Sequence, residues 1–253
     1  IKDKSPDKYN RVAERISFTD NEISRMREVS EDIYLPHSEE LEITPQDDSF
    51  LYKNPIEVDN IPEENLPLVK NWHPLIIWRY QVIKQADVLL LMLQLGDKFS
   101  RDLKIRNYDY YEPKTTHDSS LSPAIYSIIA SEIGYKNQAY NYFMQTARLD
   151  LDDYNENAYQ GVHTACMGGT WLSLVQGFGG MRMFNGKLYF HPHLPDGWNS
   201  YQFRLRFKGS QIEVTVKENS VKYMLISGEK VEFKHYDQLI VLEESNLSKE
   251  VEI

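Results

Sequence analysis

Gln176-Gly177-Phe178-Gly179-Gly180 is the stretch at which the chain changes character. Before it, apolar residues recur at helical spacing, and helices are expected over 122–133, 136–149 and 161–175. After it, β-branched and aromatic residues alternate between turn residues, and strands are expected over 187–191, 201–207, 211–216, 221–227 and 230–235. Since glycines permit a sharp change of direction, we predict a helical region, a boundary near 177–180 and a β-sandwich-like tail.

The beginning of the chain predicts helices and then a long irregular segment. Thr19 followed by Glu22 is a capping-box pattern, which indicates a helix through about Asp32, with another helical piece over 11–16. Residues 35–71 are rich in Pro, Asp, Glu and Asn and are too long for an ordinary connection. They form either a disordered linker or a long functional loop.

Two further segments have a clear compositional pattern. Residues 75–95 are apolar on nearly every side and precede Gly96, which predicts a buried helix closed by a left-handed residue. Gly134 is the expected stop of the helix over 122–133. The acidic stretch 243–250 is expected to be a frayed surface segment.

Composition excludes several function classes. The 253 residues are 41% hydrophobic, enough for a large core. A formal charge of -10 opposes extended binding to nucleic acid or to an anionic membrane, so neither is an expected partner. Cys166 is the only cysteine, which rules out an intramolecular disulfide, and residues 1–6 lack the apolar core of a signal sequence. The cytoplasm is the expected location.

The run 110–123 reads Tyr-Tyr-Glu-Pro-Lys-Thr-Thr-His-Asp-Ser-Ser-Leu-Ser-Pro and gathers acid, base and hydroxyl groups at one helix entry. Pro123 suits a first helical position with Ser122 as its cap. The hydroxyls of Ser119 and Ser120 would then lie where free backbone N–H groups and the helix dipole attract an anion. This pattern predicts a phosphate site, although ordinary capping and turn chemistry would use the same residues.

Other side chains are candidates for the same site. Lys84-Gln85 falls inside the predicted buried helix, where a lysine charge is costly unless an anion neutralises it or the side chain reaches the rim. His117 lies beside the serines, and His163 precedes a glycine-rich segment that would allow close approach of a ligand or of another helix. Glu112 is either a catalytic or sugar-binding carboxylate or a solvated turn residue.

No metal site is predicted. The acidic tract 150–157 lacks the glycine and the distal glutamate of a calcium-binding loop. His191-Pro192-His193 has no nearby cysteine and lies among strands, so a structural role is expected.

Several segments, taken together, resemble one enzyme family. They are Lys84-Gln85-Ala86-Asp87-Val88-Leu89, Tyr110-Tyr111-Glu112-Pro113, His117-Asp118-Ser119-Ser120-Leu121-Ser122-Pro123, Ala147-Arg148-Leu149-Asp150-Leu151-Asp152-Asp153-Tyr154 and Met167-Gly168-Gly169-Thr170-Trp171. In this order they closely resemble glycoside hydrolase family 65, and the resemblance extends over about residues 20–207. It implies a mainly α fold with a β tail: the C-terminal part of an (α/α)6 barrel over 1–178 and a β-sheet domain over 179–253.

The resemblance also implies a reaction. The family consists mainly of inverting phosphorylases of maltose, trehalose, nigerose or kojibiose, which release β-glucose 1-phosphate. A glutamic acid protonates the glycosidic oxygen while phosphate attacks the anomeric carbon. Inorganic phosphate is then a co-substrate and no other cofactor is expected. Residues matching Lys84, Gln85, Ser119, Ser120 and His163 line the sugar and phosphate end of the pocket, and His117 lies in the same segment.

The family's general acid belongs to a part that precedes the matched region. It is therefore expected outside this chain, which would be a fragment whose partners are the missing N-terminal half, an α-linked glucose disaccharide and phosphate, with a homodimer when complete. Glu112 is the candidate acid within the chain. Two other functions stay open: an inverting α-glucoside hydrolase in which Glu112 or a neighbour activates water, and a non-catalytic carbohydrate-binding or structural module.

Overall fold

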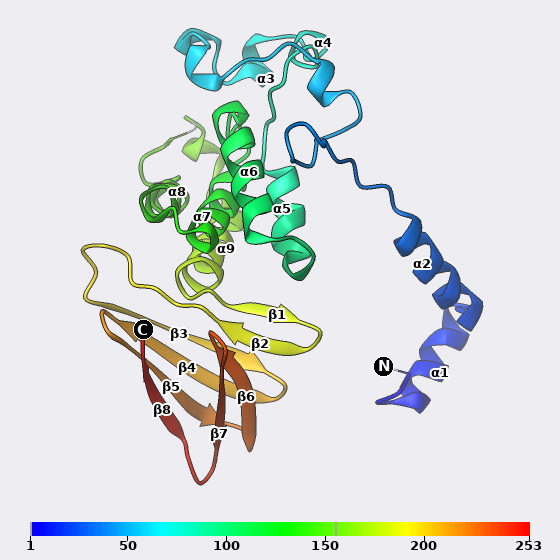
Figure 1. Cartoon of the computed structure of the whole chain (residues 1–253), viewed down its shortest axis with the longest axis vertical. Coiled ribbons are helices and arrows are strands. Elements are labelled where there is room, and N and C mark those ends of the chain that lie inside the picture. Colours follow the sequence, from blue (N-terminus) through cyan, green and yellow to red (C-terminus); the bar gives the residue numbers. More distant parts are fainter. Residues whose placement is uncertain (1, 155) are drawn as a thin grey trace. The chain divides into compact units, whose positions relative to one another are not determined.

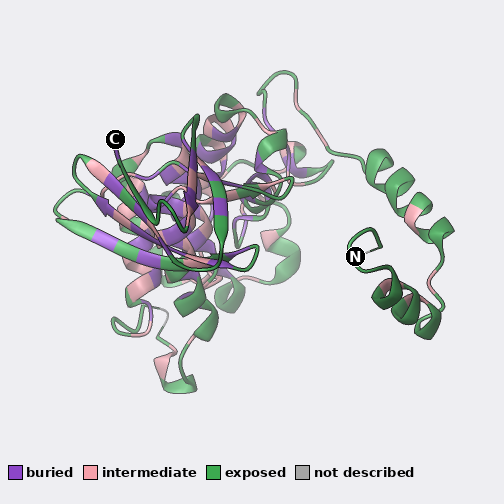
Figure 2. Ribbon diagram, turned by 90° about the horizontal axis from the view of Figure 1, so that it is seen from below, coloured by how far each residue is buried: buried purple, intermediate pink, exposed green. Residues whose placement is uncertain are grey.

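The computed structural model describes residues 2–154 and 156–253, and the chain divides into two compact units with the boundary between His37 and Ser38. The first unit holds α1 (Pro6–Arg15) and α2 (Asp20–Asp32). The Thr19 backbone N–H donates to Glu22 Oε1 at 2.8 Å, so the predicted capping box is confirmed. Neither helix buries a residue, as their exposed colour in Figure 2 shows.

The second unit begins with a long loop and continues as a group of helices (Figure 1). Its α-helices are α3 (Leu68–Asn71), α4 (Pro74–Ile77), α5 (Asp87–Gln94), α6 (Arg101–Tyr111), α7 (Ser122–Ile133), α8 (Lys136–Arg148) and α9 (Thr164–Leu172). The short 3-10 turns are η1 (Phe50–Tyr52), η2 (Val58–Asn60), η3 (Glu63–Asn65), η4 (Gly96–Lys98), η5 (Glu112–Lys114) and η6 (Ala158–Gln160), and a π-helical turn, η7 (Ser173–Phe178), follows α9. No helix in the described residues is long and apolar enough to cross a membrane.

The predicted helices α7 and α8 are confirmed. They pack against one another, and Gly134 ends α7 in the left-handed conformation (φ 93°) that a glycine adopts without steric cost. The long loop is anchored and is not a free linker. Its Phe50 side chain is buried, and the centroid of the Phe50 ring lies 5.7 Å from that of Tyr111 in α6.

The predicted helix over 75–95 is wrong. α4 ends at Ile77 and α5 begins at Asp87, and the residues between them pair with other segments instead. The Ile83 N–H donates to the Lys114 carbonyl at 2.9 Å, and the Thr116 N–H donates to the Ile83 carbonyl at 2.9 Å. These bonds satisfy the backbone of Ile83 through a distant segment and not through a helix. Apolar composition alone does not distinguish the two, and Leu75 and Trp78 of the same segment are exposed.

The residue after the predicted helix is also used differently. Gly96 begins η4 and is not among the residues with positive φ. A Cβ atom on Gly96 would lie 3.0 Å from the Phe184 ring and 3.4 Å from Lys104 Nζ, so the glycine provides space for packing and not a left-handed cap.

The sequence pattern did not reveal α6. Its first turn is capped by Ser100, whose side chain accepts from the Leu103 N–H at 3.2 Å. The buried face of α6 includes Lys104 and Asn107, both 2% exposed or less. Polar residues on the buried face obscure the apolar periodicity on which helix prediction depends.

The tail consists of two four-stranded sheets (Figure 1). One has the order β1-β2-β6-β7 and the other β3-β4-β5-β8. The strands are β1 (Arg182–Phe184), β2 (Lys187–Phe190), β3 (Ser200–Phe207), β4 (Ser210–Lys217), β5 (Ser220–Ser227), β6 (Lys230–His235), β7 (Gln238–Glu243) and β8 (Ser248–Glu252). β2 and β6 are parallel, whereas the other paired strands are antiparallel. The predicted fold class, mainly helical with a β tail, is confirmed.

The prediction of a frayed acidic end is wrong for its last residues. β8 pairs with β5 in a register that places Val251 opposite Val221. Val251 is 9% exposed and Val221 is fully buried, so a single apolar side chain secures an otherwise acidic strand to the sheet.

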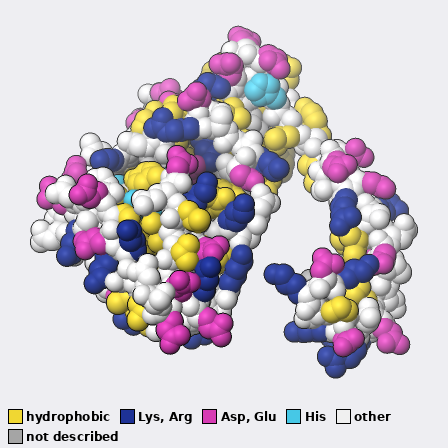
Figure 3. Space-filling model, turned by 60° about the horizontal axis from the view of Figure 1, so that its bottom comes forward, with side chains coloured by type: hydrophobic (Ala, Val, Ile, Leu, Met, Phe, Trp, Pro, Cys, Tyr) yellow, Lys and Arg dark blue, Asp and Glu magenta, His cyan; other side chains and the backbone are white. Residues whose placement is uncertain are grey.

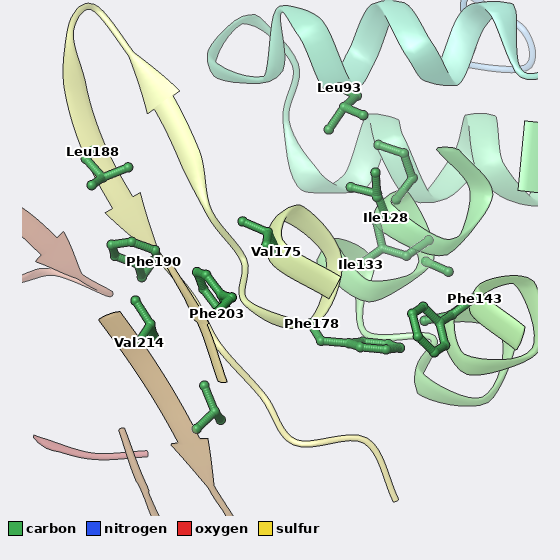
Figure 4. Close-up of a cluster of buried hydrophobic side chains, with 14 of the residues drawn as sticks. Leu93, Ile128, Ile133, Phe143, Val175, Phe178, Leu188, Phe190, Phe203 and Val214 are labelled. Atoms are coloured by element: carbon green, nitrogen blue, oxygen red, sulfur yellow. The ribbon is translucent and has the colours of Figure 1, made fainter. Parts of the chain in front are cut away.

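One hydrophobic cluster joins the helices to the sheets (Figure 4). Ile128 of α7 and Phe178 at the end of η7 belong to the same cluster as Leu188, Phe190 and Phe203 of the strands. The Phe178 ring lies 5.1 Å from that of Phe143 in α8. The two structural regions therefore share a core, while the division into domains 1–178 and 179–253 stays a prediction.

The glycine-rich stretch gives a test of this junction. Gly180 has φ 56°, and a Cβ atom there would lie 2.7 Å from the His191 backbone nitrogen. We expect Gly180→Ala to lower the melting temperature much more than Gly186→Ala, because Gly186 has φ 70° but open space around it. Gly186→Ala should cost about 1 kcal/mol for the left-handed backbone alone. Equal losses in thermal unfolding would show that the close approach at Gly180 is unimportant.

Candidate functional site

The turn between η5 and α7 carries three of the six predicted binding residues, namely His117, Ser119 and Ser120. His117 has φ 54°, an uncommon conformation outside glycine, and its Nδ1 shares a hydrogen bond of 3.0 Å with Ser122 Oγ. The Ser122 N–H donates to the Ser119 carbonyl at 3.0 Å. These bonds make residues 116–122 a closed turn, which we name the serine turn.

The predicted helix cap is wrong in detail. α7 begins at Ser122, and Leu121 occupies the cap position without a side-chain hydrogen bond. The Ser122 hydroxyl contacts His117 instead of a backbone N–H of the first turn. No side chain caps α7, but the Ser122 N–H already donates to the Ser119 carbonyl and Pro123 has no N–H, so this helix end attracts an anion mainly through its dipole.

His117 is held as a neutral imidazole. Its ring lies 4.8 Å from that of Tyr126 and 5.0 Å from that of Tyr142, and its Nε2 is buried without a hydrogen-bond partner among the described residues. Burial lowers the pKa of His117 to about 4. A neutral, enclosed ring supplies no charge to an anion, so the geometry favours a role in holding the serine turn.

Ser119 and Ser120 use their backbones internally and leave their hydroxyls available. The Ser119 carbonyl accepts from Ser122, and the Ser120 carbonyl accepts from Cys166 Sγ at 2.9 Å. Both residues are partly buried, and neither hydroxyl is hydrogen-bonded within the described part of the chain. They are the donors that a bound oxyanion would need.

His163 immediately precedes α9 and is oriented by a carboxylate. Its Nδ1 and its backbone N–H contact Asp150 oxygens at 2.5 and 2.9 Å. Hydrogen bonds from His163 lower the pKa of Asp150, which therefore stays ionised. This arrangement leaves Nε2 of His163 for a ligand. Because Cys166 in the first turn of α9 contacts Ser120, the start of α9 lies beside the serine turn.

Asp150 was not predicted as a site residue. The sequence placed it in an acidic tract that was rejected as a calcium loop and that forms part of a segment resembling the family, but no role was predicted for it. Its position, at the end of α8 and 13 residues before a histidine, gives no local signal of pairing. Only the return of the chain through η6 brings the two side chains together.

Lys84 and Gln85 occupy positions that differ from those predicted. Both are exposed in the extended segment before α5, so the argument from a buried lysine charge is wrong. Lys84 lines a pocket of about 200 Å³ together with Thr116 and Asp118, and its charge opposes the rise that burial causes in the pKa of Asp118. The lysine is therefore close to one side of the serine turn. Gln85 Nε2 donates to Asp87 Oδ1 at 2.9 Å, away from the turn.

Glu112 begins η5 and is partly buried. Its Oε1 accepts a hydrogen bond of 2.8 Å from the Tyr142 hydroxyl. Burial and the charge of Glu112 raise the pKa of Tyr142, so this hydroxyl remains a proton donor to the carboxylate. Glu112 is thereby tied to the aromatic group around His117, and its catalytic role stays a prediction.

The structure thus gathers the serine turn, the start of α9 and, on the side of Asp118, the ammonium group of Lys84. Gln85 and Glu112 make their hydrogen bonds outside the turn. Chemically, this arrangement offers hydroxyl donors, the positive end of the α7 dipole, one exposed cation and one oriented imidazole.

Comparison with known proteins identifies relatives for both regions. A sequence model of the glycosyl hydrolase family 65 central catalytic domain matches residues 3–172, and one of the family's C-terminal domain matches residues 181–242. The chain is 51% identical over 247 residues to an alpha,alpha-trehalose phosphorylase of Thermoanaerobacter brockii, covering 98% of this chain and 32% of the relative. It is 41% identical to a maltose phosphorylase of Bacillus subtilis, covering 88% and 29%.

A solved structure gives the same assignment. The chain matches a putative kojibiose phosphorylase from the human microbiome with a TM-score of 0.85 and 33% identity, over 96% of this chain and 33% of that one. The chain thus spans about a third of the length of these relatives. The family matches and this likeness together show that the chain belongs to glycoside hydrolase family 65.

Proposed function

We propose that this chain supplies the phosphate- and sugar-binding part of an inverting α-glucoside phosphorylase that releases β-glucose 1-phosphate. The serine turn carries the proposal, because it places two available hydroxyls at the uncapped start of α7. The names of relatives, trehalose, maltose and kojibiose phosphorylase, support phosphate over water as the attacking group.

Each group in the site has a distinct task in this proposal. The Ser119 and Ser120 hydroxyls donate to phosphate oxygens, and the α7 N–H groups add the partial positive charge of the helix end. Lys84 supplies a full positive charge from the side of Asp118. His163 presents Nε2, with the ring held by Asp150, and Gln85 hydrogen-bonds the sugar after releasing Asp87.

The reaction needs one group that the site does not provide. A phosphate oxygen forms a bond to the anomeric carbon as the bond from that carbon to the glycosidic oxygen breaks, and a carboxylic acid gives the leaving oxygen its proton. Attack from the opposite face inverts the configuration. We assign the acid to the part of a longer polypeptide outside these 253 residues, since Glu112 is engaged by Tyr142.

The partners follow from this assignment. They are an α-linked glucose disaccharide, inorganic phosphate, the remainder of the enzyme and, in the complete protein, a second copy, all in the cytoplasm. Phosphate acts as co-substrate, and the chemistry requires no other cofactor. On the face shown in Figure 3, acidic and basic side chains are interspersed, which with the charge of -10 disfavours nucleic acid and anionic membranes.

The serine hydroxyls can be tested by phosphate binding. We expect the double variant S119A/S120A to weaken phosphate binding to the 253-residue chain by about tenfold or more, because two hydrogen bonds to a charged ligand are lost. Titration calorimetry measures the change. Ser245→Ala, at an exposed position in the β region, is the matched control and should bind as the wild type does. Unchanged affinity in the double variant would place phosphate elsewhere.

The enclosed imidazole predicts a pH dependence of stability. The folded pKa of His117 is about 4, below its ordinary 6.5, so between these values the unfolded chain binds the extra proton. Stability from this group is complete above about pH 6.5 and is lost as pH falls toward 4, by on the order of 3 kcal/mol in all. H117Q should flatten the pH dependence of denaturant unfolding in this window. The exposed His73→Gln control should retain it.

Because the proposed general acid lies outside these 253 residues, we expect the isolated chain to be inactive. General-acid assistance is worth on the order of 10²–10⁴-fold, so the 253-residue chain should release no detectable glucose 1-phosphate from maltose, trehalose, nigerose or kojibiose. The complete polypeptide should do so. Robust turnover by the chain alone, abolished by Glu112→Gln, would make Glu112 the acid and overturn the assignment.

A further inference from the structure

A larger cavity lies at the junction of the helices and the first sheet, apart from the serine turn. Its volume is about 590 Å³, and it is formed by the end of α7, the start of α8, β1, β2 and the β6–β7 turn. This volume falls within the about 300–1,000 Å³ typical of small-molecule sites. None of the candidate site residues described above lines it.

Unused polar groups of both charges surround this junction pocket. Besides the Arg182–Glu132 pair, the cations are Lys136 and Lys234 and the carboxylates are Asp97 and Asp237. The side chains of these four residues form no hydrogen bond or ion pair with another described residue, so donors and acceptors are both available. Equal numbers of each sign suit a neutral polar ligand better than an anion, which two carboxylates would repel.

Arg182, which also lines the pocket, is already paired with groups of the protein. Arg182 donates to Glu132 Oε2 at 2.7 Å and to the Gln176 carbonyl. His191 adds little charge, since burial and then Arg182 lower its pKa. Glu132 is shared with Lys104, so Arg182 keeps part of its charge, but its two terminal nitrogens already donate to protein acceptors and are not free to form a bidentate pair with a phosphate or a carboxylate.

Aromatic faces provide the apolar part of the lining. Phe184 of β1 and Tyr189 of β2 lie with ring centroids 6.0 Å apart on one hairpin, and both line the cavity. Tyr236 stacks on His191 at 4.9 Å and is 43% exposed. Flat apolar faces beside unpaired hydrogen-bonding groups match a sugar ring, which has C–H faces and a rim of hydroxyls.

From this combination we infer that the junction pocket is a second carbohydrate site, which binds a neutral sugar of one or two rings between the helices and the first sheet. The inference does not depend on phosphorolysis at the serine turn, because no residue is shared between the two places. Occupation of the pocket would join α8 to the β6–β7 turn through the ligand and stabilise the junction.

Binding of maltose and trehalose to the 253-residue chain, followed by saturation-transfer NMR and calorimetry, tests the inference. We expect Y189A, and separately the double variant K234Q/D237N, to weaken sugar binding by about tenfold, since one removes an aromatic face and the other the charged hydrogen-bonding groups. The variant K234Q/D237N removes no packed ring, so it tests the inference even if the fold does not tolerate the space that Y189A creates. K222Q, on β5 of the other sheet, is the matched control and should bind normally.

The serine-turn variant separates this inference from the proposed function. S119A/S120A should retain sugar binding at the junction pocket even where it loses phosphate. No sugar binding by the wild-type chain, binding unchanged in both Y189A and K234Q/D237N, or sugar binding lost only in S119A/S120A would each overturn the inference. Failure of phosphate binding with sugar binding intact would refute the proposed function alone.

Discussion

The position of the helices relative to the first sheet depends on the ion pairs of one carboxylate, that of Glu132 near the end of α7. It bonds Lys104 of α6 on one oxygen and Arg182 of β1 on the other. Burial by itself raises the pKa of Glu132, but the charges of Arg182 and Lys104 outweigh this effect and hold that pKa below its usual range. Lys104 is the buried member, 2% exposed, so loss of Glu132 would leave its charge without compensation, a change that typically costs about 3–5 kcal/mol.

This ionic junction has consequences at both ends of α7. Its C-terminal end is held against the β region by Glu132 and by the shared apolar cluster around Phe178. Its N-terminal end then has a defined position, and the serine turn leads directly into it. A site built on the end of a rigid, packed helix can hold ligand groups more accurately than one built on a free loop.

The aromatic rings that pack against the serine turn also fix its position. His117 contacts Tyr126 and Tyr142, and Tyr142 in turn donates to Glu112. The serine turn therefore packs, through His117, against rings of α7 and α8 and is not surrounded by solvent on that side. A neutral His117 with a left-handed backbone is a locally unfavourable arrangement that the surrounding packing maintains, as is common near functional sites.

The sequence alone determined the elements whose signals are local. The capping box of α2, the glycine stop of α7 and the alternating strands follow from contacts between near neighbours in the chain, and all are present. The serines, Lys84 and His163 were chosen by residue type and by family resemblance. The structure brings the serines beside the start of α9 and Lys84 beside Asp118, and their joint binding of phosphate is our proposal.

Only the tertiary structure decided the features that depend on distant partners. The chain leaves the helical form around Ile83 because the backbone of Ile83 bonds to that of Lys114 and Thr116, and α6 is stable with Lys104 inside because Glu132 meets it from α7. Asp150 orients His163 only after the chain returns from α8 to α9. The physical reason is common to all three: the free energy of burying an apolar or charged group depends on which atoms surround it, and these atoms belong to segments far away in the sequence.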